Sequence, residues 1–245
     1  MSNIVTMKPY NQEQTKKEQV EEMFDNIAPS YDRLNHIISF NLDRMWRRRV
    51  MRIVRRAKAT KIMDIATGTG DLAIAMAKRL DRTQILGVDL SEEMLAVARR
   101  KVQKQGLEER IMLEKGDAEN LSMVESGSID AVTVAFGVRN FENLEQGLRE
   151  IHRTLREGGK FVVLELSVPK NRLIRWFYAQ YSHRVLPRIG AMISKDKQAY
   201  VYLPESIDEF PAPERFAEML KEAGFKGVKR RKQSFGVAHI YEAVK

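Results

Sequence analysis

The sequence predicts an α/β protein with a doubly wound, mostly parallel sheet. From residue 61 onward, short apolar runs of strand length alternate with stretches in which apolar residues recur at helical spacing. Strands that alternate with crossover helices build a parallel sheet covered by helices on both faces. Glycines agree with this reading, because Gly106 follows one helical run, Gly158 and Gly159 follow another, and Gly224 closes a third, as helix C-caps do.

The expected elements follow one another in a regular order. Strands are expected at residues 61–66, 84–90, 110–116, 129–136, 160–166, 227–234 and 236–244. Helices are expected at residues 18–28, 42–57, 71–80, 91–105, 143–159 and 212–225. The two earliest helices suggest an N-terminal helical extension over residues 1–59, followed by a ligand-binding domain over residues 60–245.

The segment 42–57 predicts an amphipathic helix with one apolar and one basic face. The apolar face carries Leu42, Met45, Trp46, Val50, Ile53 and Val54, and the basic face carries Arg44, Arg47, Arg48, Arg52, Arg55 and Arg56. We expect the apolar face to dock on the domain and the arginines to be solvated. Contact of the arginines with an anionic membrane or with nucleic acid is compatible with that arrangement.

Residues 167–205 interrupt the alternation with an aromatic and basic stretch. Segments beside the carboxyl ends of parallel strands form ligand crevices, so we expect a helical lid insertion here. The side chains expected to line an apolar groove are Leu173, Trp176, Phe177, Tyr181, Leu186, Ile189 and Met192. Ordinary packing of two extra helices explains the same residues.

Composition excludes several classes of protein. The 245 residues include 42 Lys and Arg against 33 Asp and Glu, a formal net charge of +9, and no Cys. The lack of Cys excludes disulfides, thiolate metal sites and cysteine nucleophiles. No apolar run approaches the roughly 18 residues of a membrane-spanning helix, and the polar N-terminus predicts a cytoplasmic location. The positive charge leaves nucleic acid, an anionic membrane and an acidic ligand open as partners.

The strongest local signal is a glycine turn between the first strand of the alternation and the next helix. Gly68 and Gly70 permit a tight turn and close approach to a ligand, and Asp89, at the end of the next strand, suits a ribose diol. This pattern predicts a nucleoside-containing cofactor. Asp64 and Asp71 disfavour a pyrophosphate and favour a cationic cofactor such as S-adenosylmethionine. No Gly-Lys-Ser/Thr follows the turn, which excludes a P-loop nucleotide site.

Several segments resemble one family of enzymes. These segments are FDNIAPSYDRLN, ATGTGD, GVDLSEEML, GDAENL, AVTVAFGVRN, LREIHRTLREGG, YSHRVLPRIG and AYVYLPESI. They are similar to the ubiquinone and menaquinone biosynthesis C-methyltransferases, a branch of the class I S-adenosylmethionine-dependent methyltransferases. The resemblance extends from Met23 to the end of the chain. It implies a Rossmann-like, seven-stranded sheet and S-adenosylmethionine as the cofactor.

The resemblance also implies which residues hold the cofactor. They are Gly68, Thr69, Gly70, Asp89, Asp117, Ala118 and Ala135. The glycine turn would contact the methionyl part, and Asp89 would accept both ribose hydroxyls, because a carboxylate offers paired acceptors. Asp117 would bind the adenine amino group, with the Ala118 amide facing the ring nitrogen and the Ala135 backbone nearby. Without the resemblance, Asp117 is also explained as a turn-capping residue.

The implied reaction is methylation of a ring carbon in a prenylated hydroquinone. The expected substrate is demethylmenaquinol, with 2-methoxy-6-polyprenyl-1,4-benzoquinol as an alternative or second substrate. A nucleic-acid methyltransferase is the alternative of a different class. It is disfavoured because Phe-Gly-Val-Arg-Asn stands where base-amine methyltransferases carry an Asn-Pro-Pro-Tyr type run. Peripheral contact with an anionic bilayer would bring the protein to such a lipid-soluble substrate.

Four residues are candidates for the chemistry: Arg139, Asn140, Tyr31 and Asp32. Arg139 is expected to stabilise the developing oxyanion, directly or through water, and Asn140 to orient the ring. Tyr31 and Asp32 could close over the substrate, with Asp32 as a candidate base.

The four histidines give no obvious alternative base. His183 falls in the expected lid, whereas His152 lies in an amphipathic repeat and is expected to be structural. His36 and His239 have no assigned role. The spacing of His, Asp and Glu predicts no metal site, and the oligomeric state stays open.

Overall fold

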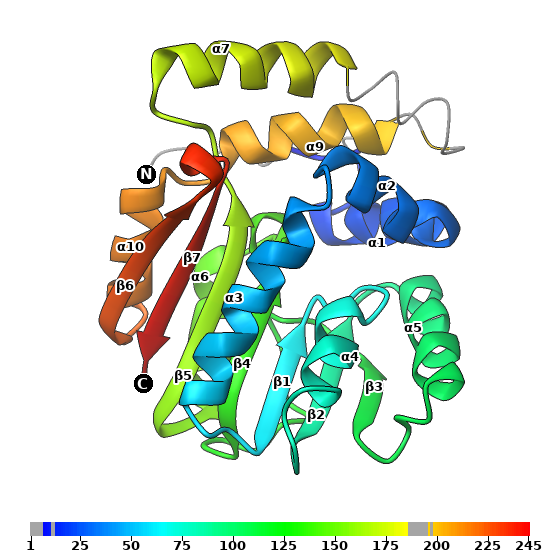
Figure 1. The fold of residues 1–245 in the computed structure, drawn as a ribbon, viewed down its shortest axis with the longest axis vertical. Helices are drawn as coiled ribbons and strands as arrows, with labels where there is room; N and C mark the ends of the chain where they lie inside the picture. Colours follow the sequence, from blue (N-terminus) through cyan, green and yellow to red (C-terminus); the bar gives the residue numbers. More distant parts are fainter. Residues whose placement is uncertain (1–6, 11–12, 186–195, 197) are drawn as a thin grey trace.

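The computed structural model describes residues 7–10, 13–185, 196 and 198–245. Its centre is a single seven-stranded sheet with the order β3-β2-β1-β4-β5-β7-β6 (Figure 1). The strands are β1 (Lys61–Ile65), β2 (Gln84–Asp89), β3 (Ile111–Lys115), β4 (Ile129–Ala135), β5 (Leu155–Leu166), β6 (Lys226–Gln233) and β7 (Ala238–Val244). The predicted fold class is confirmed.

The sheet is parallel except at one end. Strands β1 to β5 run parallel, and β7 pairs antiparallel with both β5 and β6. Successive residues of β1 face opposite sides, so Ile62 packs in one core cluster while Met63 and Ile65 pack in another. The chain order reverses between β1 and β4, and ligands of such sheets bind at the carboxyl ends beside that point.

Helices cover both faces of the sheet. They are α1 (Lys16–Ile27), α2 (Tyr31–Ile38), α3 (Leu42–Arg56), α4 (Asp71–Ala77), α5 (Glu92–Lys104), α6 (Leu144–Thr154), α7 (Arg172–Gln180), α9 (Gln198–Glu209) and α10 (Pro213–Glu222). In Figure 1, α3 and α4 lie in front of the sheet and α6 and α10 lie behind it. Apolar side chains on both sides of the strands are therefore buried, which explains their nearly continuous apolar sequences.

A third layer of helices lies above the carboxyl ends of the strands. Helices α1, α2, α7 and α9 stack there in Figure 1. Residues of α1, α2 and α9 share a separate apolar cluster that also includes Met94 of α5. A capping box between Thr15 and Glu18 starts α1, because the Thr15 side chain accepts from the Glu18 amide and Glu18 accepts from the Thr15 amide. This layer covers the carboxyl ends of the strands, where a ligand is expected to bind.

The prediction that glycines follow the ends of helices is correct for two helices and wrong for a third. Gly106 and Gly224, both at positive φ, follow the ends of α5 and α10. By contrast, α6 ends at Thr154 and β5 begins at once, so Gly158 and Gly159 lie inside a strand. There the pairing of β4 with β5 shifts register, and a Cβ on residue 159 would lie 2.7 Å from the Arg156 carbonyl oxygen. These glycines serve a strand irregularity.

Helix α3 packs by its apolar face as predicted, with two exceptions. Trp46, Val50 and Val54 are buried, but Leu42 is partly exposed. Arg47 turns inward and forms ion pairs with two carboxylates, which removes it from the basic face. The remaining basic face consists of the exposed residues Arg44, Arg48, Arg52, Arg55 and Arg56, named here the arginine row.

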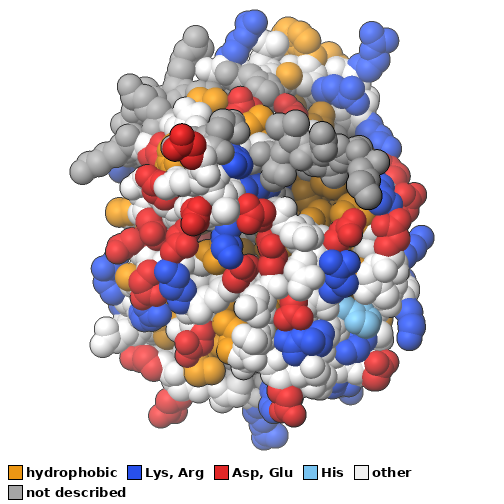
Figure 2. Space-filling view, turned by 180° about the vertical axis from the view of Figure 1, so that it is seen from behind, with side chains coloured by type: hydrophobic (Ala, Val, Ile, Leu, Met, Phe, Trp, Pro, Cys, Tyr) orange, Lys and Arg blue, Asp and Glu red, His pale blue; other side chains and the backbone are white. Residues whose placement is uncertain are grey.

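The charge of the molecule is mixed on the opposite side. Figure 2 shows acidic and basic side chains interspersed over the face behind the sheet, with small apolar groups between them. Within the described ranges, no helix has the length and apolar character needed to cross a bilayer. Because α3 packs on the sheet beside α4 and β5, it forms part of the central core, and the division of the chain at residue 60 stays a prediction.

Candidate active site

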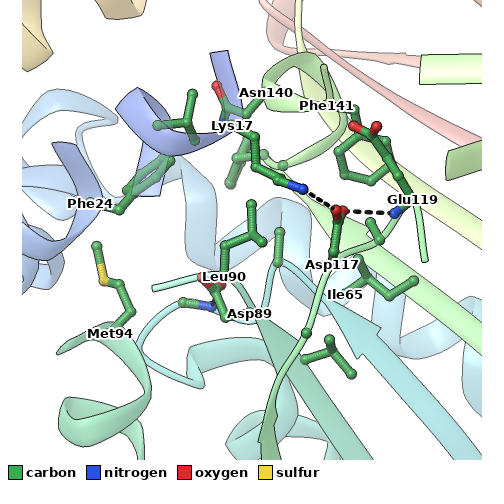
Figure 3. A pocket seen from close by; sticks show the side chains of 18 of the residues that line it. Lys17, Phe24, Ile65, Asp89, Leu90, Met94, Asp117, Glu119, Asn140 and Phe141 are labelled. Carbon is green, nitrogen blue, oxygen red and sulfur yellow. Dashed lines mark hydrogen bonds and ion pairs between the residues drawn. The ribbon is translucent and has the colours of Figure 1, made fainter. Parts of the chain in front are cut away.

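Two cavities meet above the carboxyl ends of β1 and β4. The first cavity lies beside the glycine turn and the ends of β2 and β3, and α1 covers it (Figure 3). The second cavity, of about 260 Å³, lies between α1, α2, the start of α3 and α9. Four residues line both: Phe24, Tyr31, Phe136 and Asn140. We call these four the shared wall.

The backbone at the junction is unusual. Ala66 directly follows β1 and Phe136 directly follows β4, and both have positive φ angles, of 51° and 64°. Such conformations are costly outside glycine and occur mainly where a site needs them. Gly137 completes the contact, since a Cβ there would lie 2.4 Å from the Ala66 Cβ. The two strand ends are thus pressed together beneath the shared wall.

Asp89 ends β2 with its carboxylate facing the glycine turn. Its Oδ2 accepts a hydrogen bond from the Gly68 amide at 2.7 Å, and its Oδ1 accepts from the Ser91 amide at 3.0 Å. Burial raises the pKa of Asp89 to about 6, although these backbone donors favour the ionised form. Each oxygen keeps a lone pair, so the ionised side chain can accept from two neighbouring hydroxyls.

Asp117 lies across the first cavity from the turn, in the loop after β3. Its Oδ1 accepts from the Glu119 amide at 2.9 Å, the turn-capping contact, and its Oδ2 lies 3.0 Å from Lys17 Nζ (Figure 3). Ala118 and Ala135 also line this cavity. Sequence reasoning did not single out Lys17, because a lysine early in a polar helix resembles any solvated charge.

The first cavity fits a cationic nucleoside. Four carboxylates line it, Asp89, Asp117, Glu119 and Glu142, against the single ammonium group of Lys17. Apolar side chains that can flank an adenine ring line it as well, namely Val20, Val88, Leu90, Met94 and Phe141. S-adenosylmethionine carries a sulfonium and an ammonium group and matches both properties.

Asp64 and Asp71 do not supply this negative charge. Asp64 is buried below the turn, where it accepts from Thr67 Oγ1 at 2.8 Å. Asp71 pairs with Arg47 at 3.1 Å and with Lys101 at 2.6 Å. Neither lines the first cavity. The carboxylates that make this cavity acidic are therefore different from the two that the sequence indicated.

Asp32 and Thr69 contact each other outside both cavities. Thr69 Oγ1 donates to Asp32, whose other carboxylate oxygen lies 2.7 Å from Lys101 Nζ. Neither residue lines a cavity, and Gly70 does not either. The structure therefore brings Gly68 but not Gly70 or Thr69 to the cavity wall, and it ties Asp32 to the glycine turn, away from the shared wall.

The second cavity is largely apolar. Its walls include Met23, Ile27, Ile38, Trp46, Leu166, Tyr178, Leu203 and Ile207. Of the side chains expected to form an apolar groove, Tyr181 lines it, whereas Leu173, Trp176 and Phe177 are exposed on α7. That expectation was wrong for these three, because α7 presents Tyr178 to the cavity. Leu186, Ile189 and Met192 lie outside the described residues.

Arg139 reaches the wall of the second cavity from the turn after β4. Its Nη1 lies 2.7 Å from Glu165 Oε1 and donates to the Phe136 carbonyl at 2.7 Å, and its Nε donates to Ser206 Oγ at 3.3 Å. Burial opposes the charged form, yet the Glu165 carboxylate holds the pKa of Arg139 above its ordinary value. Among the described residues Nη2 has no hydrogen-bond partner, so it is the donor left for a ligand.

Asn140 and Tyr31 both belong to the shared wall. The Tyr202 hydroxyl of α9 donates to Asn140 Oδ1 at 3.2 Å. Burial raises the pKa of Tyr31, which keeps its hydroxyl protonated near neutrality. Sequence reasoning missed Tyr202, Glu165 and Phe24, although the YLPESI segment contains the first of these and offered a signal.

The three histidines whose side chains are described, His36, His152 and His239, line neither cavity. His152 packs edge-on against Phe225, with ring centroids 5.0 Å apart, as expected for a structural residue. His36 Nδ1 lies 3.1 Å from Asp43 Oδ2, and His239 is buried beside Ser167. The His183 side chain lies outside the described residues. Among the residues that are described, no group of three His, Asp or Glu side chains could hold a metal ion.

Fold and site together define a class I methyltransferase that uses S-adenosylmethionine. The chain matches the ubiE/COQ5 methyltransferase family over residues 12–245 and belongs to that family.

Relatives and solved structures agree with this assignment. The chain is 44% identical to a demethylmenaquinone methyltransferase of Bacteroides fragilis over 98% of its own length and 97% of the relative. It is 42% identical to a ubiquinone/menaquinone biosynthesis C-methyltransferase UbiE of Geobacter sulfurreducens, over 94% of this chain and 90% of that protein. A possible histamine N-methyltransferase from Thermotoga maritima shares the fold, with a TM-score of 0.60 at 18% identity, over 91% of this chain and 99% of that one.

Proposed function

We propose that the protein methylates a ring carbon of demethylmenaquinol to give menaquinol. One observation carries this proposal: an acidic cofactor cavity and an apolar cavity share a wall, and a buried arginine stands beside that wall. A prenylated naphthoquinol needs an apolar space for its ring and tail and a cation near its oxygen. The relatives named demethylmenaquinone methyltransferase support the choice of this quinol.

The residues of the shared wall act by positioning. S-adenosylmethionine would supply the methyl group from its sulfonium and leave as S-adenosylhomocysteine. The acceptor is a ring carbon of the reduced quinol, and this carbon would lose its hydrogen as a proton, which restores the aromatic ring. Loss of a proton from the neighbouring hydroxyl places electron density on that carbon. Nη2 of Arg139 stabilises the resulting oxyanion, directly or through water, and Asn140, held by Tyr202, orients the ring. Phe24 and Phe136 keep bulk solvent away from the path of the methyl group.

Asp32 takes a supporting role in this proposal. Its ion pair with Lys101 and its contact with Thr69 fix the glycine turn, on which Gly68 meets the cofactor. The proton acceptor is a water molecule at the wall of the second cavity, because the described carboxylates near that wall, such as Asp43 and Glu165, are already ion paired.

A benzoquinol is the second candidate substrate. The relative from Geobacter sulfurreducens is named for both ubiquinone and menaquinone biosynthesis. Incubation with methyl-deuterated S-adenosylmethionine and either reduced demethylmenaquinone or reduced 2-methoxy-6-polyprenyl-1,4-benzoquinone separates the two by mass spectrometry. Label on the naphthoquinol alone supports the proposal, and label on both means a shared enzyme. Label on the benzoquinol alone, or on neither, contradicts it.

The same proposal includes contact with an anionic bilayer. The arginine row lies on α3, whose first residue, Leu42, lines the second cavity and is partly exposed. Phe40, also at that cavity, is exposed, and Phe235 is 79% exposed two residues from Val237 of the cavity wall. A bilayer that contacts the arginine row and these apolar side chains lies beside the second cavity, so that a prenyl tail can enter the cavity from the lipid.

Vesicle binding tests this contact with a matched control. Replacing Arg48, Arg52 and Arg55 by Ser removes three charges from the arginine row, each worth on the order of 1 kcal/mol near an anionic surface. Binding to phosphatidylglycerol vesicles should fall about a hundredfold. Replacing Arg149, Arg215 and Lys221 by Ser removes the same charge from helices behind the sheet and should change binding little. Equal losses in both triple variants contradict a defined contact face.

A further inference from the structure

Helix α1 is fastened over the cofactor cavity by several polar contacts. At its start, Lys16 Nζ donates to the carbonyl oxygens of Arg139 and Phe141, at 3.1 and 3.2 Å. One turn later Glu21 pairs with Lys115 at 2.7 Å, and Asp25 accepts from Ser91 near the start of α5. These contacts lie on both sides of the cavity, and Lys17, Val20 and Phe24 of α1 line it between them.

One of the α1 contacts differs from the others. Lys17 pairs with Asp117 at 3.0 Å, and both side chains line the cavity. Figure 3 shows the Lys17 ammonium beside the Asp117 carboxylate, joined to it by a dashed line. The other oxygen of Asp117 is already bonded to the Glu119 amide. A ligand amino group that approaches Asp117 from the cavity therefore meets Lys17 first.

We propose that Lys17 is a latch residue, which holds α1 closed through Asp117 in the cofactor-free protein and is displaced by the adenine amino group. The proposal rests on the assignment of Asp117 to adenine. Cofactor entry breaks the Lys17–Asp117 ion pair, and the Asp117 carboxylate then accepts a hydrogen bond from the nucleoside. The latch lowers the affinity of the enzyme for its cofactor by the strength of this pair, and it keeps the empty cavity covered.

The partial exposure of the Lys17–Asp117 ion pair determines how much cofactor affinity should change when Lys17 is replaced. Lys17 is partly exposed, and ion pairs of that kind contribute little in water, so its removal should tighten cofactor binding about two- to five-fold. The gain should appear mainly as faster association, because the cofactor no longer has to displace the Lys17 ammonium from Asp117. Lys17→Met keeps the length of the side chain and its contact with the cavity while removing the charge.

The test compares Lys17→Met with Lys115→Met by surface plasmon resonance. Lys115 forms the neighbouring α1 ion pair, with Glu21, but does not line the cavity, so it controls for a general loosening of α1. The probe is S-adenosylhomocysteine, which lacks the sulfonium and has no net charge, so that relief of simple repulsion does not contribute. A Lys17→Arg variant retains the ion pair and should behave as the wild type.

Three outcomes decide the matter. Tighter, faster binding by Lys17→Met alone supports the latch. Unchanged or weaker binding by Lys17→Met overturns it, because Lys17 would then be neutral or would help to hold the ligand. Equal tightening by both variants also overturns it, since any loosening of α1 would suffice. Failure of the quinol proposal is distinguishable, because an enzyme that methylates no quinol can still bind S-adenosylhomocysteine and show the latch.

Discussion

Arg139 and Glu165 form an ion pair that is almost completely withdrawn from solvent. Nη1 and Oε1 lie 2.7 Å apart, and the side chains are 7% and 1% exposed. The two residues follow β4 and lie on β5, which are neighbouring strands of the sheet. Glu165 therefore fixes the guanidinium at the wall of the second cavity and keeps it in the charged form. Through this pair, a strand of the central sheet holds the side chain that is proposed to stabilise the oxyanion.

Replacing Arg139 by Gln should lower kcat without lowering the affinity for the cofactor. Loss of one donor to a developing oxyanion costs about 10²- to 10³-fold in turnover. Arg139 does not line the first cavity, so the affinity for S-adenosylhomocysteine should stay the same. Steady-state kinetics and calorimetry measure the two quantities, and Arg153→Gln, at a surface pair on α6, serves as the control. Unchanged kcat would exclude the proposed role.

The same substitution should also lower stability. Arg139→Gln leaves the Glu165 carboxylate buried without its counter-ion, which costs roughly 3–5 kcal/mol of unfolding free energy. Adding Glu165→Gln removes the stranded charge and should recover part of that loss. Urea unfolding measures this difference. A double variant that regains stability but not turnover separates the chemical role of Arg139 from its structural one, whereas recovery of turnover contradicts the chemical role.

Asp89→Asn should weaken cofactor binding strongly. The carboxylate offers two acceptors to a ribose diol, and hydrogen bonds to a charged group contribute about 1.5–3 kcal/mol each, so the loss should be at least tenfold. Asp130→Asn is the matched control, because Asp130 caps β1 from the opposite end of the sheet and lines no cofactor cavity. Equal affinities of the Asp89 variant and the wild type in calorimetry argue against the cofactor site.

Cofactor affinity should fall as the pH drops below 6. The pKa of Asp89 is raised to about 6 by burial, so the folded protein holds this proton more tightly than the unfolded chain. Its contribution to stability is therefore greatest at low pH and is lost as the pH rises from about 4 to 6, while the ionised form binds the diol. At pH 5 binding should be about tenfold weaker than at pH 7. Asp64 titrates in the same range, and Asp89→Asn should abolish the dependence only if Asp89 causes it.

Gly137→Ala should disrupt the junction of β1 and β4. Residue 137 has an ordinary φ of −116°, so the cost comes from the new Cβ, which would lie 2.4 Å from the Ala66 Cβ. Overpacking of this kind costs about 1–3 kcal/mol, and the displaced Phe136 should lower kcat as well. At Gly127, φ is positive but nothing lies within 4 Å, so Gly127→Ala should lower stability while leaving kcat unchanged. A kcat loss shared by both variants contradicts the local explanation.

The periodicity of the chain predicted the sheet well because strands buried on both faces have a distinctive sequence. The apolar runs that end at Ile65, Asp89 and Ala135 are the strands whose carboxyl ends form the site. The end of α6 was misplaced, since a glycine pair inside an irregular strand has the same local pattern as a helix C-cap. The local sequence does not distinguish a helix C-cap from an irregular strand, because the pairing of this segment with β4 decides between them.

The site was only partly predictable for a different reason. Asp89 ends β2 and Asp117 follows β3, so their place is fixed by the sheet itself. Lys17 and Tyr202 reach the cavities through the packing of α1 and α9, and Glu165 reaches Arg139 from β5. No local spacing encodes that packing. The same limit explains why Asp32 was expected at the substrate and why Trp176 was expected in the apolar groove.

Methylation of the quinol but not of the quinone is best tested by transfer of a labelled methyl group to the reduced and the oxidised forms of demethylmenaquinone. The protein is incubated with methyl-deuterated S-adenosylmethionine and either form in vesicles, and the ring is analysed by mass spectrometry. We expect label on the ring carbon beside the hydroxyl of the quinol and none on the quinone, because only the phenolate activates that carbon. Equal labelling of both forms, or none of either, would contradict it.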